Sequence, residues 1–137
     1  MQITYISHGL HETGGYRHEK ALTEAISDEI NNCTICYKEI RFRKNYRGIF
    51  AWFLLFFKSF IHAKGDLIIT VSRLVWPVYL RNIFNKNKIV VVLHNFDKND
   101  GKPKLYFSLL EGFFKKARKY PERFLVITVA EYWKEKL

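Results

Sequence analysis

Cysteine, methionine and proline are scarce in this sequence, with two, one and three copies in 137 residues. Two cysteines are too few for a disulfide-rich scaffold. Cys33 and Cys36 form a CxxC pair with no further ligands at a zinc-site spacing, so we expect reduced thiols in the core and no bound metal. The chain opens on a strand-like segment with no leader peptide, which predicts a cytoplasmic protein.

Acidic residues are also few, and the 13 of them against 23 basic residues give a net charge of +10. Such a chain attracts polyanions, including phosphorylated ligands, anionic membranes and nucleic acid. A nucleic-acid surface requires basic residues interleaved with exposed aromatics on one face. Here the basic residues fall into two separate groups, which argues against a nucleic-acid partner. The groups are Lys38, Arg41, Arg43, Lys44, Arg47, Lys58 and Lys64, and then Lys115, Lys116, Arg118, Lys119 and Arg123.

Hydrophobic residues are plentiful at 48%, and many of them form short runs rich in β-branched residues. Five such runs predict strands, and the last three lack polar alternation, which is typical of parallel strands covered on both faces. The predicted strands are Gln2–Ser7, Thr34–Ile40, Asp66–Val71, Lys88–Leu93 and Arg123–Val129.

Helical patterns alternate with these runs. Pro77 is compatible only with the first turn of its helix. The predicted helices are Thr13–Asn31, Arg47–Ala63, Val75–Phe84, Lys104–Tyr120 and the short Ala130–Leu137. The alternation predicts an α/β fold: one Rossmann-like domain over residues 1–137, with a doubly wound parallel sheet of about five strands.

The first strand-to-helix turn contains Gly14 and Gly15. A Walker A loop is disfavoured, because Gly15-Tyr16 stands where that motif has Lys followed by Ser or Thr, and the dinucleotide motif GxGxxG is absent. Two interpretations remain open. The glycines either let a diphosphate approach the N–H groups of a helix N-terminus, or serve only a tight turn. Arg17 would add a charge-assisted bond to a phosphate.

Histidines stand near the ends of two predicted strands. His94 follows an apolar strand and precedes Asn95, so it is either a packing residue or a functional group at the carboxyl edge of the sheet. His8, His11 and His18 cluster in the first loop, where solvated positions or phosphate contacts are favoured over metal binding.

The run Ile49–Phe57 contains nine consecutive apolar residues. Roughly 20 are needed to cross a bilayer, so the run does not predict a membrane span. Two interpretations fit it. One is a helix buried between the sheet and a neighbour, with snorkelling basic flanks. The other is a surface that holds an acceptor or docks on anionic lipid, placing the protein at the inner face of a membrane. Its candidate residues are Arg43, Lys44, Arg47, Trp52, Phe53 and Lys58.

The order of four features resembles the N-terminal domain of family 4 retaining glycosyltransferases, which have the GT-B architecture of two facing Rossmann-like domains. They are the first strand Ile3–Ser7, the loop Gly14-Gly15-Tyr16-Arg17-His18, the strand leading into His94-Asn95, and the closing segment Phe124–Leu137. One departure is Ala130, which stands where the family often has serine.

The resemblance implies that the parent protein transfers a sugar from a nucleotide sugar to a glycan or lipid-linked acceptor. It implies that Gly14 and Gly15 face the donor diphosphate and that His94 is catalytic, near the donor sugar. Tyr16, Arg17, His18 and Asn95 are candidate contacts to acceptor or phosphate. The resemblance implies no metal and no tightly bound cofactor. The family binds the nucleotide sugar chiefly through a C-terminal Rossmann-like domain that these residues do not include, so the isolated chain is expected to be inactive.

A second hypothesis is non-catalytic. The same strand and helix pattern suits a stand-alone Rossmann-like or flavodoxin-like module that binds a phosphorylated ligand or a protein partner.

Overall fold

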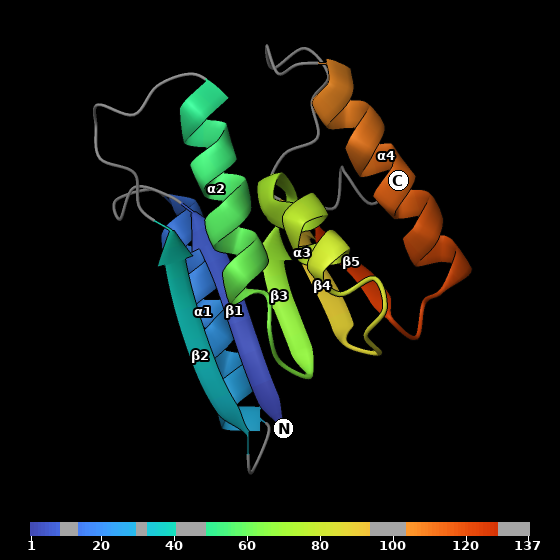
Figure 1. Cartoon of the computed structure of the whole chain (residues 1–137). Coiled ribbons are helices and arrows are strands. Elements are labelled where there is room, and N and C mark those ends of the chain that lie inside the picture. Colours follow the sequence, from blue (N-terminus) through green and yellow to red (C-terminus); the bar gives the residue numbers. More distant parts are fainter. Residues whose placement is uncertain (9–13, 30–32, 41–48, 94–103, 129–137) are drawn as a thin grey trace.

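Five parallel strands form one sheet in the order β2-β1-β3-β4-β5. The computed structural model describes residues 1–8, 14–29, 33–40, 49–93 and 104–128 (Figure 1). The strands are β1 (Gln2–His8), β2 (Thr34–Ile40), β3 (Leu67–Val71), β4 (Lys88–Leu93) and β5 (Phe124–Thr128). All four strand pairs are parallel. The predicted α/β fold with a doubly wound parallel sheet is therefore confirmed.

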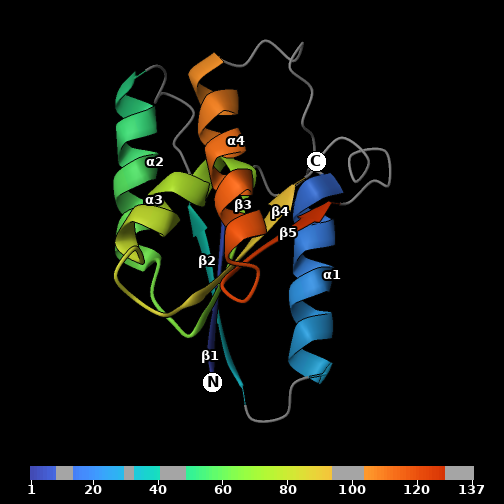
Figure 2. The same ribbon diagram turned by 90° about the vertical axis from the view of Figure 1, so that its right-hand side faces the viewer.

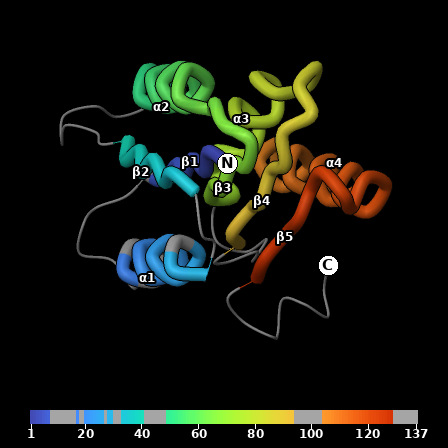
Figure 3. The backbone as a smooth tube through the Cα atoms, turned by 90° about the horizontal axis from the view of Figure 1, so that it is seen from below, coloured from blue at the N-terminus to red at the C-terminus, as the bar shows by residue number. Residues whose placement is uncertain are grey.

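Helices cover the two faces of the sheet unequally. The long helices are α1 (Gly14–Glu29), α2 (Ile49–His62) and α4 (Lys104–Lys119), and a 3-10 turn (Ser72–Leu74) leads into α3 (Val75–Arg81). α1 lies on one face, whereas α2, α3 and α4 lie on the other (Figures 2 and 3). Because every strand is parallel, the strands end and the long helices begin at the same edge, which we call the carboxyl edge.

The larger part of the core lies between the sheet and the three-helix layer. It contains Leu55 from α2, Val78 and Tyr79 from α3, and Leu110 and Phe113 from α4. Rings meet edge to face there, with the Tyr79 and Phe113 centroids 6.3 Å apart. Aromatic pairs in this arrangement add stabilisation beyond the area that they bury.

The smaller part of the core lies under α1. Ile3, Tyr5 and Val92 are fully buried there, and Leu22 and Ile26 of α1 pack against this cluster. Leu22 and Ile26 are four residues apart, so they share one face of the helix. The face of α1 that contains Leu22 and Ile26 is therefore turned towards the sheet.

β3 is covered on both faces, as its apolar sequence predicts, but β5 is not. Four of the five β3 residues are buried, whereas in β5 Leu125 remains 53% exposed. β5 is an edge strand, and α1, the helix described on that face, contacts β2 at the opposite side of the sheet. For the described residues, the expectation that β5 is covered on both faces is therefore wrong.

The third helix is shorter than predicted and ends at Arg81. Pro77 lies in its first turn, as its missing N–H requires. The buried Asn82 stops the helix because its side-chain amide donates to the Val78 carbonyl at 2.8 Å and to the Ala63 carbonyl at 3.1 Å. Its amide thus also ties the end of α3 to the residue that follows α2. The predicted helix Ala130–Leu137 lies outside the described residues.

Candidate functional site

The strand order places a topological switch point between β1 and β3. The chain leaves β1 towards α1 on one face, and it leaves β3 towards α3 on the other face (Figure 3). Connections that diverge in this way open a crevice at the carboxyl edge, where open α/β sheets bind their ligands. The segments after β1 and β3 are therefore the first candidates for a binding site.

Gly14 and Gly15 form the start of α1, at the carboxyl edge. The first turn of a helix has backbone N–H groups without intrahelical partners, and the helix dipole makes this end positive. No acidic residue stands in the first turn of α1, and Arg17 is exposed there. This end of α1 thus has the electrostatic character that an anion requires. Tyr16 and His18 belong to α1, but their side chains lie outside the described part of the structure.

Ser72 and Arg73, on the other side of the switch point, were missed from the sequence. The Ser72 hydroxyl lies 2.9 Å from the Tyr106 hydroxyl in the first turn of α4, and either group can donate this hydrogen bond. Arg73 is exposed, with its guanidinium 5.8 Å from the centre of the Trp52 ring on α2. Ser72-Arg73 directly follows an apolar strand, which is the signal that could have identified it.

Several predicted site residues lie outside the described residues. These are His94, Asn95, Arg43, Lys44 and Arg47. Their proposed roles therefore stay predictions. His8 ends β1, but its side chain is not described, and His11 lies outside the described residues.

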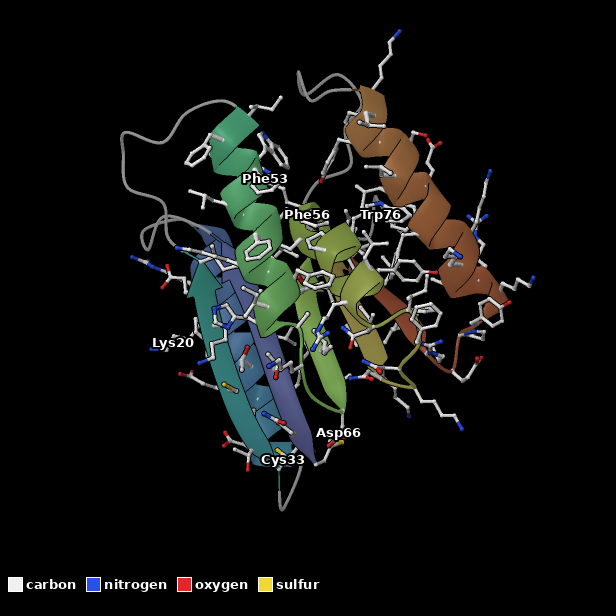
Figure 4. The ribbon with its side chains drawn as sticks, in the orientation of Figure 1. Lys20, Cys33, Phe53, Phe56, Asp66 and Trp76 are labelled. Carbon is white, nitrogen blue, oxygen red and sulfur yellow. The ribbon has the colours of Figure 1, made fainter. Side chains whose placement is uncertain are left out.

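The remaining predicted residues, Trp52, Phe53 and Lys58, project from α2 and are exposed. Trp52 is 48% and Phe53 is 66% exposed, and within α2 only Leu55 and Ser59 are buried. Within the described structure, α2 is thus not buried on all sides. Phe53 and Phe56 lie on the surface of α2 in Figure 4, whereas Trp76 of α3 is half-buried.

The last turn of α2 is electropositive. Although the His62 side chain is exposed, partial burial of its ring lowers its pKa below the ordinary value of 6.5, and the positive charges of Lys38, Lys58 and Lys64 lower this pKa further. A helix C-terminus favours a protonated histidine, but here burial and the three lysines prevail. His62 is therefore neutral at neutral pH.

Cys33 and Cys36 are free thiols, and both are half-buried, so neither lies deep in the core. Among the described residues, no group of three or more His, Cys, Asp or Glu side chains is placed to hold a metal ion. None of the described helices has the length and apolar character that crossing a bilayer requires.

The carboxyl edge therefore combines a glycine-initiated helix start, two exposed arginines and a hydroxyl pair around one switch point. Comparisons with protein families, with curated proteins and with solved structures found no match for this chain.

Proposed function

We propose that this chain is the N-terminal domain of a retaining glycosyltransferase that moves a sugar from a nucleotide donor to a glycan or lipid-linked acceptor. The observation that carries the proposal is the start of α1 at Gly14-Gly15, beside the switch point between β1 and β3. A parallel α/β sheet with this feature suits one wall of a cleft that receives a diphosphate.

In the proposed reaction, the leaving diphosphate gains negative charge as the bond to the sugar breaks. The backbone N–H groups of the first turn of α1, with the side chain of Arg17, would stabilise that charge without reorganising. Arg73 stands on the other side of the switch point and adds a second cation at this edge. His94 would orient or polarise the donor sugar, in the role that the sequence resemblance implies.

In this proposal, a C-terminal Rossmann-like domain of the parent protein binds most of the nucleotide sugar. It follows that the chain alone would bind the donor weakly and would not catalyse sugar transfer. The proposed reaction needs neither a metal ion nor a tightly bound cofactor. The proposal also includes the cytoplasmic location that the sequence predicts.

Titration of the ¹⁵N-labelled chain with uridine or guanosine diphosphate, followed by NMR, tests this assignment. We expect weak binding in fast exchange, with the largest shifts at Gly14, Gly15 and Arg17 and smaller ones at Ser72 and Arg73. A Gly15→Val variant is expected to lose these shifts, because its side chain blocks close approach to the backbone. Shifts confined to other regions would contradict the proposed role of this edge, and tight binding would contradict the assignment to a transferase domain.

A second candidate function is a stand-alone flavodoxin-like module that binds a phosphorylated ligand. The strand order favours it, since 2-1-3-4-5 is the order of flavodoxin-like sheets, whose ligand also binds at the switch point between β1 and β3. Tight binding of a phosphorylated ligand by the chain alone would support this candidate over the transferase domain.

A further inference from the structure

The outward face of α2 is apolar except at Lys58 and His62. A surface helix normally turns polar and charged residues to solvent. On α2, Lys58 and His62 are the only exposed residues that are not apolar, and they stand near its C-terminal end. The exposed apolar residues are Ile49, Phe50, Trp52, Phe53, Phe56, Phe57 and Ile61. A continuous apolar surface of this kind marks an interaction site.

Exposed apolar residues continue beside α2. α3 packs against α2 on the same side of the sheet (Figures 1 and 3). Leu80 and Ile83 are each 41% exposed, and Phe84, just beyond α3, is 97% exposed. We call the exposed apolar residues of α2, together with these three, the aromatic face.

Positive charge surrounds the aromatic face. Between Ile49 and Asn87 the single acidic residue is Asp66, and its carboxylate accepts a hydrogen bond from the Gln2 backbone at 2.8 Å. Two cations lie over the rings of α2, because Arg73 is 5.8 Å from the Trp52 ring and Arg81 is 5.6 Å from the Phe60 ring. The exposed basic residues of this region are Lys58, Lys64, Arg73, Arg81 and Lys86.

We propose that the aromatic face docks on an anionic lipid bilayer, with α2 lying in the plane of the headgroups. Helices that bind in this way have aromatic and aliphatic residues on one side and lysine or arginine at the border. The aromatic rings enter the boundary between headgroups and acyl chains, while the basic residues contact lipid phosphates.

The length of α2 agrees with a position on the bilayer and not across it. Its 14 residues extend for about 21 Å, whereas the hydrocarbon core is about 30 Å thick. The buried side of the helix is also committed to the protein, since Leu55 packs into the main core.

A second copy of the chain is a poorer occupant of this surface than lipid. A symmetric dimer through the aromatic face would bring the same patch of each copy together. The arginines and lysines at its border would then meet their own counterparts without acidic partners, and like charges placed together across an interface oppose binding. An anionic bilayer satisfies both the apolar rings and the cations.

The docking surface has a defined relation to the carboxyl edge. Ile49, Phe50 and Phe53 lie at the N-terminal end of α2, which is the end near the carboxyl edge (Figure 1). Arg73 links the two regions, because it follows β3 at the switch point and its guanidinium lies 5.8 Å from the centre of the Trp52 ring. A docked chain therefore holds its candidate ligand site close to the membrane surface. Docking itself does not depend on the proposed sugar transfer.

Co-sedimentation of the 137-residue chain with lipid vesicles tests the proposal. We expect binding to phosphatidylcholine vesicles that contain phosphatidylglycerol, and much weaker binding to phosphatidylcholine alone. Phe53→Ser and Phe57→Ser are each expected to weaken binding roughly tenfold or more, because each removes a ring that enters the bilayer. Their matched control is Leu105→Ser, which removes an apolar side chain that is 68% exposed on α4.

Charge variants test the second half of the proposal. Arg81→Gln and Lys58→Gln are each expected to weaken binding to anionic vesicles roughly fivefold. The control variants Lys115→Gln and Lys119→Gln change exposed residues of α4 and are expected to have little effect. Circular dichroism of every variant checks that the fold is retained.

Fluorescence provides an independent measurement that does not rely on a loss of binding. Trp52 is expected to be quenched by lipids that carry bromine near the top of the acyl chain, and the Trp52→Phe variant is expected to lose that quenching while still binding. Binding indifferent to anionic lipid, or equally weakened by the α4 controls, would overturn the proposal. A dimer that Phe53→Ser abolishes, without vesicle binding by the unchanged protein, would assign the face to a second copy instead.

Discussion

At the scale of single residues, Gly65 has a role that the sequence did not identify. It joins the segment after α2 to β3 with a φ of 134°, a backbone conformation that residues with a side chain rarely adopt. A Cβ atom at this position would lie 2.9 Å from Thr4 Oγ1 and 3.1 Å from the Gln2 carbonyl oxygen. Conformation and space therefore both require glycine here.

Gly65→Ala is expected to destabilise the protein by about 1–3 kcal/mol, the usual cost of placing a side chain in such a conformation. The measurement is urea unfolding followed by circular dichroism. Gly112→Ala is the matched control, because Gly112 is inside α4 and its Cβ would meet only Trp76, at an ordinary contact distance of 3.8 Å. The control is expected to gain about 0.5–1 kcal/mol. Equal effects of the two substitutions would contradict this account.

Residue roles at the site were only partly predictable. Gly14 and Gly15 could be found because two adjacent glycines before a helical pattern are a strong local signal for a turn into a helix. The contact between Ser72 and Tyr106 could not be found, because it joins residues 34 positions apart and requires β3 to be placed beside β4, with α4 packed above. No local pattern contains that arrangement.

At the scale of elements, the sequence predicts strands more accurately than helix ends. β2 and β4 have the predicted bounds, since apolar β-branched runs are cut off sharply by polar residues. α3 ends before the end of the apolar pattern that predicted it, because the Asn82 side-chain amide donates a hydrogen bond to the Val78 carbonyl and occupies this helical acceptor. The outward face of α2 could not be decided from sequence, since the apolar run Ile49–Phe57 fits both burial and lipid docking.

The C-terminal end of α2 also allows a pH prediction. The folded-state pKa of His62 is lowered below 6.5, so the unfolded chain binds a proton more readily than the folded one. The free energy of unfolding is therefore expected to fall as the pH drops below about 6.5, and above that value His62 contributes no pH dependence. The loss is small, because the side chain is exposed and water screens its charge.

Urea unfolding of the unchanged protein and of His62→Gln, above and below this pH, measures the contribution. The unchanged protein is expected to lose stability relative to the variant on acidification. Lys38, Lys58 and Lys64, which come from β2, α2 and the segment after α2, supply the positive field. A stability difference that does not change with pH, or that changes in the opposite direction, would exclude this assignment.

At the scale of the whole molecule, three features lie at the same edge of the sheet. The switch point, the start of α1 and the N-terminal end of α2 all belong to the carboxyl edge, while the aromatic face extends from that edge along α2. The net charge of +10 favours anionic partners at both places. A diphosphate at the carboxyl edge and lipid phosphates at the aromatic face are both anionic partners. A single orientation of the molecule on a membrane allows both to bind.

The most direct test of the central claim is the turnover of the full-length product of the gene. The transferase proposal predicts that the coding sequence continues past Leu137 into a second βα domain. It also predicts that the product releases nucleoside diphosphate from a nucleotide sugar only when a glycan or lipid-linked acceptor is present. Gly15→Val is expected to lower turnover roughly tenfold or more with an unchanged melting temperature, because the diphosphate loses its close contact with the start of α1. Unchanged turnover in this variant, or a coding sequence that stops at Leu137, would contradict the account.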